Sequence, residues 1–141
     1  MDIDYSKMEP MTWTYVKTFH LNPPKTTLPR QECVIGRYNQ NMKIIKATKT
    51  IQQHLMEKYF SDSETIVLVP NEYPYFTVSN VSHYLLWIHP SVKVSTSTKI
   101  REIIDTKIRE TVECKEYIYF ENNLDNKSIP DIRHFHIFIR F

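Results

Sequence analysis

Two histidines share one face of the segment that ends the chain. Residues 133–140 read Arg-His-Phe-His-Ile-Phe-Ile-Arg, with an apolar residue at every second position from Phe135. Successive side chains of a β-strand point to opposite faces, which places His134 and His136 on the same side as Arg140. The pattern predicts a strand with one face toward the core and one face that carries chemistry.

A second segment repeats this arrangement. In residues 83–89, the side chains of His83, Trp87 and His89 fall on one side, and the other side carries only aromatic and aliphatic residues. Four of the six histidines of the chain therefore lie on two predicted strand faces. Such clustering indicates a site built from imidazoles.

Three interpretations of these imidazoles remain open. An unprotonated imidazole nitrogen can attack phosphorus when an acceptor holds the other ring nitrogen, and Arg140 could then bind the phosphate oxygens. His134 and His136 together with His83 would also supply the three imidazoles of an open zinc site. The third interpretation is a set of surface or half-buried histidines without a ligand. We expect no metal, because no carboxylate or cysteine lies at strand spacing from the final two histidines.

Aromatic residues are expected on the same faces. Residues 116–121 predict a strand with Ile118 and Phe120 toward the core and its two tyrosines and Glu121 outward. An outward ring such as Trp87 can stack on a nucleobase, which contributes ~1 to 3 kcal/mol per base. The alternative is that these rings pack beneath a loop or a helix.

The hydrophobic periods predict the elements that must position these residues. Helices are expected where apolar residues recur every three to four positions, and strands where they alternate or form short buried runs. Prolines between the first two helices indicate an extended linker. The expected helices are residues 8–20, 39–60 and 97–112, and the expected strands are residues 65–70, 82–89, 116–121 and 133–140.

This order predicts an α+β fold, with an antiparallel sheet and helices packed on one apolar face. The opposite face is expected to be an open polar and aromatic surface. It would carry His83, Trp87, His89, Tyr117, Tyr119, Glu121, His134, His136 and Arg140.

Composition limits the possible functions. The 141 residues suffice for one domain, with residues 1–30 as an N-terminal helix and Pro-rich extension and residues 31–141 as the core. A net charge of +2 excludes a global basic field, so any anion must be captured locally. A single glycine excludes a Gly-rich phosphate loop. Few Gly and Ala beside many Ile, Lys and Asn indicate an AT-rich coding genome, such as that of a large DNA virus or of an AT-rich microbe.

The cysteines and the apolar segments bear on location. Cys33 and Cys114 lie far apart without metal-type spacing, and no segment reads as secretory or membrane-spanning. We therefore expect a reduced compartment, cytoplasmic or nuclear, and no membrane partner.

Several blocks carry a resemblance to a known family. Residues 71–75 read Asn-Glu-Tyr-Pro-Tyr and residues 83–87 read His-Tyr-Leu-Leu-Trp. Residues 119–122 read Tyr-Phe-Glu-Asn, residues 127–129 read Lys-Ser-Ile, and residues 134–136 read His-Phe-His. These blocks resemble the fungal N-acetylglucosamine-induced protein family, whose domain has no established activity.

The same order of blocks resembles, more distantly, the histidine-triad and galactose-1-phosphate uridylyltransferase superfamily. That resemblance implies a histidine-triad-like fold and a reaction in which His136 attacks a nucleotide α-phosphate, with His134 and His83 as supporting imidazoles. The chain departs from the pattern, because Phe138 replaces the third histidine and Ser128 lies further from the first histidine than the superfamily's serine does.

Two functional hypotheses follow. The first is a phosphohydrolase or nucleotidyl transferase that uses the His-x-His strand, with no cofactor. The second is a non-catalytic module that binds a nucleotide, an mRNA cap or an RNA end. The missing third histidine favours the second hypothesis, and the retained His-x-His pair favours the first.

The turn and strand-end residues have two possible roles. They could contact the ligand, or they could only stabilise the local turn or strand end. The candidate ligand-binding residues are Asn71, Tyr75, Trp87, Tyr119, Glu121, Asn122, Lys127, Ser128 and Arg140.

Overall fold

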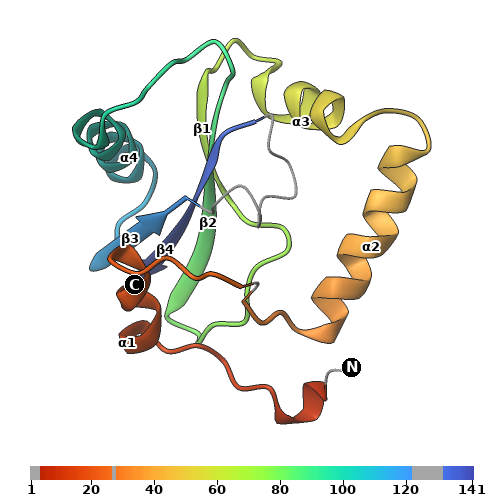
Figure 1. Cartoon of the computed structure of the whole chain (residues 1–141), viewed down its shortest axis with the longest axis vertical. Coiled ribbons are helices and arrows are strands. Elements are labelled where there is room, and N and C mark those ends of the chain that lie inside the picture. Colours follow the sequence, from red (N-terminus) through yellow and green to blue (C-terminus); the bar gives the residue numbers. More distant parts are fainter. Residues whose placement is uncertain (1–3, 27, 122–131) are drawn as a thin grey trace.

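The computed structural model describes residues 4–26, 28–121 and 132–141. It is a single α+β domain in which a four-stranded sheet lies between helices (Figure 1). The chain order is η1 (Tyr5–Lys7), α1 (Trp13–Val16), η2 (Lys17–His20), α2 (Glu32–Lys46), α3 (Ile51–Phe60), β1 (Ile66–Pro70), β2 (Val81–Ile88), α4 (Ser97–Thr111), β3 (Glu116–Phe120) and β4 (His134–Arg140).

The sheet order is β1-β2-β4-β3, and all neighbouring strands are antiparallel. This confirms the predicted α+β class and antiparallel sheet. The alternating segment at the end of the chain is a central strand, because β4 pairs with β2 on one side and with β3 on the other. The register sets Trp87 opposite His134, Leu85 opposite His136 and His83 opposite Phe138.

Helices cover both faces of the sheet, so the prediction of one open face is wrong. Figure 1 shows α4 on one side of the sheet and α2 and α3 on the other. Ile104 and Ile108 of α4 pack against the face of Ile137. On the opposite face, Phe19 of η2 packs on Phe138, and Leu55 of α3 belongs to the cluster around Trp87. The histidine face is therefore an interior layer.

The predicted orientation of the β3 side chains relative to the histidines is also wrong. Ile118 and Phe120 pair in register with Phe138 and His136, so they share the histidine face. Tyr117 and Tyr119 turn instead toward α4, where the hydroxyl of Tyr117 donates a hydrogen bond to Asp105 at 2.8 Å. Both faces of the sheet are buried, so an apolar side chain of β3 can belong to either face. The apolar pattern of β3 therefore does not show which face carries the histidines.

The predicted helix over residues 39–60 is divided in the structure. α2 begins earlier, at Glu32, and ends at Lys46, and α3 starts after Thr50. Thr50 accepts a hydrogen bond from the backbone of Gln53, whose side chain accepts one from the backbone N–H of Thr50. This capping box starts a new helix and lets α2 and α3 meet at an angle over the sheet (Figure 1).

Candidate functional site

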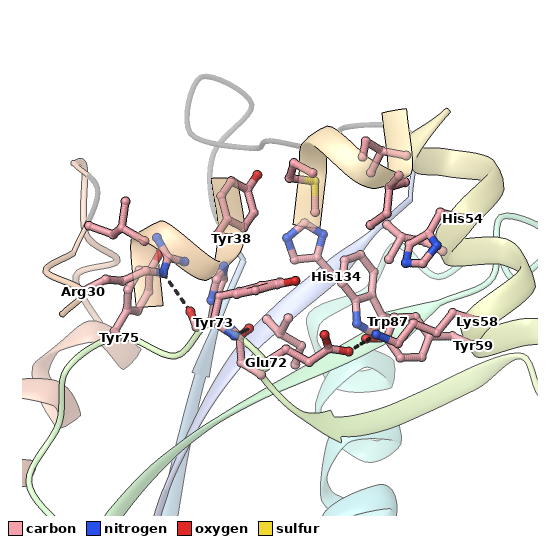
Figure 2. Close-up of a pocket in the computed structure, with 18 of the residues that line it drawn as sticks. Arg30, Tyr38, His54, Lys58, Tyr59, Glu72, Tyr73, Tyr75, Trp87 and His134 are labelled. Carbon is pink, nitrogen blue, oxygen red and sulfur yellow. Dashed lines mark hydrogen bonds and ion pairs between the residues drawn. The ribbon is translucent and has the colours of Figure 1, made fainter. Parts of the chain in front are cut away.

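A cavity of about 390 Å³ lies between α2, α3 and the histidine face of the sheet. His134 of β4 and Trp87 of β2 line it from the sheet, and Tyr59 lines it from α3 (Figure 2). His136 of β4 lines it as well. The ring of Trp87 stacks on Tyr59, with centroids 5.6 Å apart, and lies tilted against His134, with centroids 4.6 Å apart. The volume falls within the usual range for small-molecule sites, roughly 300 to 1,000 Å³.

A chain of hydrogen bonds fixes which nitrogen of His136 carries a proton. The backbone N–H of Tyr75 donates to Nδ1 of His83 at 3.1 Å, so that nitrogen is unprotonated. Neutral His83 therefore carries its proton on Nε2, which donates to Nδ1 of His136 at 2.8 Å. Neutral His136 must then be protonated at Nε2. Any group that meets His136 through this nitrogen has to accept a hydrogen bond.

His134 has the opposite arrangement. Its Nδ1 lies 3.2 Å from the carbonyl oxygen of Ile132, which can only accept, so Nδ1 donates. The Nε2 of neutral His134 is therefore unprotonated. The two neighbouring imidazoles, with centroids 5.6 Å apart, present a hydrogen-bond acceptor and a hydrogen-bond donor to the same cavity.

Burial keeps the rings of His83 and His136 neutral. We call this hydrogen-bonded pair the relay. The pKa of His136 is lowered to about 3, chiefly because burial disfavours the charged ring, and further by the charges of His134 and Arg30. Burial and the same neighbours, together with His136, hold the pKa of His83 well below its ordinary value. Both rings are therefore neutral at pH 7.

Cations lie at two sides of the cavity (Figure 2). The Nε of Arg30 donates to the carbonyl oxygen of Tyr73 at 2.8 Å, and its guanidinium carbon lies 4.1 Å from the centroid of the Tyr75 ring. No carboxylate among the described residues forms an ion pair with Arg30. Lys58 instead pairs with Glu72, and partial burial lowers its pKa. Arg30 is thus the cation best placed to take up an anionic ligand.

A buried donor in the cavity wall lacks a partner. The indole nitrogen of Trp87 makes no hydrogen bond within the described part of the chain, although Trp87 is only 4% exposed. Buried donors of this kind are rare in folded proteins, and an absent ligand or water is a common explanation.

The structure brings together part of the predicted site. Five of the predicted residues line the cavity, and His83 lies behind them, bonded to His136. The five are Asn71, Tyr75, Trp87, His134 and His136.

Other predicted residues lie elsewhere. Arg140 pairs with Glu116 at 2.7 Å and covers Trp13, outside the cavity. Glu121 forms an ion pair with Arg133 at 2.9 Å, and Tyr119 lies on the α4 face. His89 follows the end of β2 and contacts the ring of Phe60 instead of the cavity. The predicted residues Asn122, Lys127 and Ser128 lie outside the described residues.

Several lining residues carried no sequence signal. Arg30 follows the Pro-rich linker, and Lys58 reads as one member of a solvated helix face. Tyr38 and Tyr59 belong to α2 and α3. Their convergence depends on the break between the two helices, which the continuous helical period conceals. A capping-box search at Thr50 and Gln53 would have found the break.

The described residues contain neither a cluster of metal ligands nor a membrane-spanning helix. No group of three or more His, Cys, Asp or Glu side chains there is placed to hold a metal ion. Within the same ranges, no helix combines the length and the apolar character needed to cross a membrane.

Comparisons with known proteins establish the family. No curated protein matches the chain. The crystal structure of HTC1 has a similar fold, with a TM-score of 0.65 and 18% sequence identity over 93% of this chain and 85% of that chain. Neither of the two resemblances seen in the sequence is confirmed by these matches, and both stay predictions. The family described as "Protein of unknown function (DUF3605)" matches residues 12–140, and the chain belongs to it.

Proposed function

We propose that the cavity binds a nucleotide or the nucleotide cap of a larger molecule. The observation that carries this proposal is the placement of Arg30, a cation without a carboxylate partner among the described residues, in a cavity walled by aromatic rings. An aromatic wall suits a nucleobase, and a guanidinium suits a phosphate. A nucleotide combines both groups at the scale of this cavity.

The guanidinium of Arg30 is preorganised to bind phosphate. Its Nε bond to the carbonyl of Tyr73 and its contact with the ring of Tyr75 hold the guanidinium in place. The other N–H groups of a guanidinium form a planar fork that matches two phosphate oxygens. A held side chain loses less conformational entropy when the ligand binds, which favours affinity.

The remainder of the cavity suits the base. Tyr38, Tyr73 and His134 lie between Arg30 and Lys58 in Figure 2. The indole N–H of Trp87 is a hydrogen-bond donor, which a base carbonyl or ring nitrogen accepts. The proposed ligand therefore places its phosphate at Arg30 and its base along the sheet.

The protonation of His136 favours binding over the reaction that the histidine-triad resemblance implies. Attack on phosphorus needs an unprotonated Nε2, and the relay through His83 puts a proton there. A module that reads a nucleotide, an mRNA cap or an RNA end, in the cytoplasm or nucleus, needs only the donor.

A fluorescence titration tests the proposal. In a Trp13→Phe protein the remaining indole is Trp87, and mononucleotides or cap analogues are expected to quench or shift its emission. Arg30→Ala in that background should weaken affinity by about 10- to 100-fold, because hydrogen bonds to charged groups contribute about 1.5 to 3 kcal/mol.

The matched control is Arg101→Ala, which removes an exposed arginine from α4 on the far face of the sheet and should leave affinity unchanged. An unchanged Trp87 emission at millimolar concentrations of every nucleotide would contradict the proposal. Equal losses of affinity in the two arginine variants would contradict the assignment of Arg30.

A further inference from the structure

The geometry points to His134 as a general base that activates water against a phosphate ester or anhydride of a nucleotide held in the cavity. This inference rests on the proposed nucleotide site and adds a reaction to it. It reverses the roles that the sequence predicts for the two histidines, because His134 becomes the reactive imidazole and His136 a hydrogen-bond donor.

The hydrogen bonds of the two rings carry this assignment. The carbonyl of Ile132 accepts from Nδ1 of His134, so the basic nitrogen of that ring is Nε2. A base of this kind needs its second nitrogen held by an acceptor, so that the ring is oriented and the correct tautomer is kept. The carbonyl can accept from Nδ1 both before and after Nε2 takes a proton, so protonation does not require the ring to turn.

The two rings next to His134 do not take up protons. Burial lowers the pKa of both His83 and His136, and the positive charge of His134 contributes to the shift in each. A proton on His136 would also place two N–H groups against each other, because Nε2 of His83 already donates to it. His83 and His136 therefore stay neutral.

The surroundings of His134 suit an anionic reaction centre. His134 is 6% exposed and has Trp87 against one side and His136 nearby. The guanidinium of Arg30 and the Nε2–H of His136 can bind oxygens of the phosphate as negative charge builds up during attack. The exclusion of bulk water strengthens these interactions.

The step balances as a hydrolysis. The water oxygen attacks phosphorus and forms a new P–O bond while one water proton moves to Nε2 of His134. The bond from phosphorus to the leaving oxygen breaks, and that oxygen keeps the electron pair. His134 then gives its proton to the leaving group or to solvent, which restores the neutral ring.

Two substitutions of His134 test the assignment with a panel of nucleoside mono-, di- and triphosphates, dinucleoside polyphosphates and cap analogues. His134→Asn keeps an N–H near the position of Nδ1, so the bond to Ile132 can persist, but it has no basic nitrogen. We expect wild-type protein to hydrolyse at least one member, and His134→Asn to lower turnover about 10²- to 10⁴-fold. Affinity for the product should stay within tenfold of wild type. Added imidazole should partly restore turnover to His134→Ala, which leaves space for it.

The tautomers give a readout that needs no substrate. Long-range ¹H–¹⁵N spectra at pH 7 should show His136 protonated at Nε2 and the neutral form of His134 protonated at Nδ1. The reverse pattern would overturn the inference, as would full turnover in His134→Asn. A wild-type protein that binds nucleotides but hydrolyses none of the panel would overturn the inference and leave the proposed binding function standing. Failure to bind any nucleotide would remove both.

Discussion

Between pH 6.5 and pH 5 the protein is expected to lose about 3 kcal/mol of its free energy of unfolding, because His83 and His136 are buried in neutral form. In the unfolded chain both rings take up protons near their ordinary pKa of about 6.5. In the folded protein His136 does so only near pH 3, and the pKa of His83 is also well below its ordinary value. The unfolded state therefore binds more protons throughout this interval, and stability falls as pH falls.

The sign and the slope follow from proton linkage. Each histidine contributes about 1.4 kcal/mol per pH unit below its unfolded pKa, and the contribution is complete above that pKa. Urea unfolding at pH 7.5, 6.0 and 5.0 measures the change. The double variant His83→Leu/His136→Leu removes both groups together and should show a much flatter dependence on pH. Equal stability of wild-type protein at pH 7.5 and pH 5.0 would contradict the neutral relay.

Phe138→Ala is expected to lower the free energy of unfolding by about 3 to 5 kcal/mol, the usual cost of truncating a buried phenylalanine. Phe138 has no exposed surface and lies flat against His83, with centroids 4.7 Å apart and planes 8° apart. It also contacts the rings of Tyr75 and Phe120, so the truncation leaves a cavity within a continuous stack.

Two further variants test whether this loss of stability comes from the buried, apolar position of Phe138. Phe141→Ala removes a phenylalanine that is 42% exposed and should cost much less in the same urea titration. Phe138→His would restore the third histidine of the resembling superfamily, but it buries a polar ring beside an imidazole whose two nitrogens are already bonded. We expect it to destabilise by about 1 to 3 kcal/mol. A Phe138→His protein as stable as wild type would show that this position is not confined to packing.

The strands could be predicted from the sequence because their signal is local. The alternation in β4 and in β2 survives any arrangement of the neighbours, and it correctly placed His134, His136 and His83 on one side of the sheet. The apolar stripe of α4 similarly identified the helix that covers the other face.

The layers could not be predicted in the same way. Whether one or both faces of a sheet are covered depends on where distant helices pack, and β4 is buried on both faces. Once both faces are apolar, the side chains of β3 give no sign of which face carries the histidines. Its register with β4, which puts Phe120 opposite His136, decides that instead.

The choice of phosphate-binding arginine shows a related limit. Arg140 shares a face with His136, but four residues of strand separate them by about 13 Å. It pairs with Glu116 at its own end of the sheet. Arg30 is remote in sequence and reaches the cavity because it sits against the turn that carries Tyr73 and Tyr75. Spacing predicts which side of a strand a residue occupies, and it does not predict which other segments approach that side.

The roles of the two histidines also lay beyond the sequence. The tautomers of His134 and His136 differ because a different group meets Nδ1, a carbonyl in one case and the Nε2–H of His83 in the other. That difference arises from the pairing of β2 with β4 and from the backbone N–H of Tyr75.

A crystal structure with the most tightly bound nucleotide of the panel would locate the ligand in the protein. We expect the ligand between α2, α3 and the sheet, with its phosphate on the guanidinium of Arg30 and facing the two cavity histidines, and with its base beside Trp87. A protein saturated with nucleotide in solution whose ligand instead occupies the α4 face, or lies in the cavity without touching Arg30, would contradict this expectation.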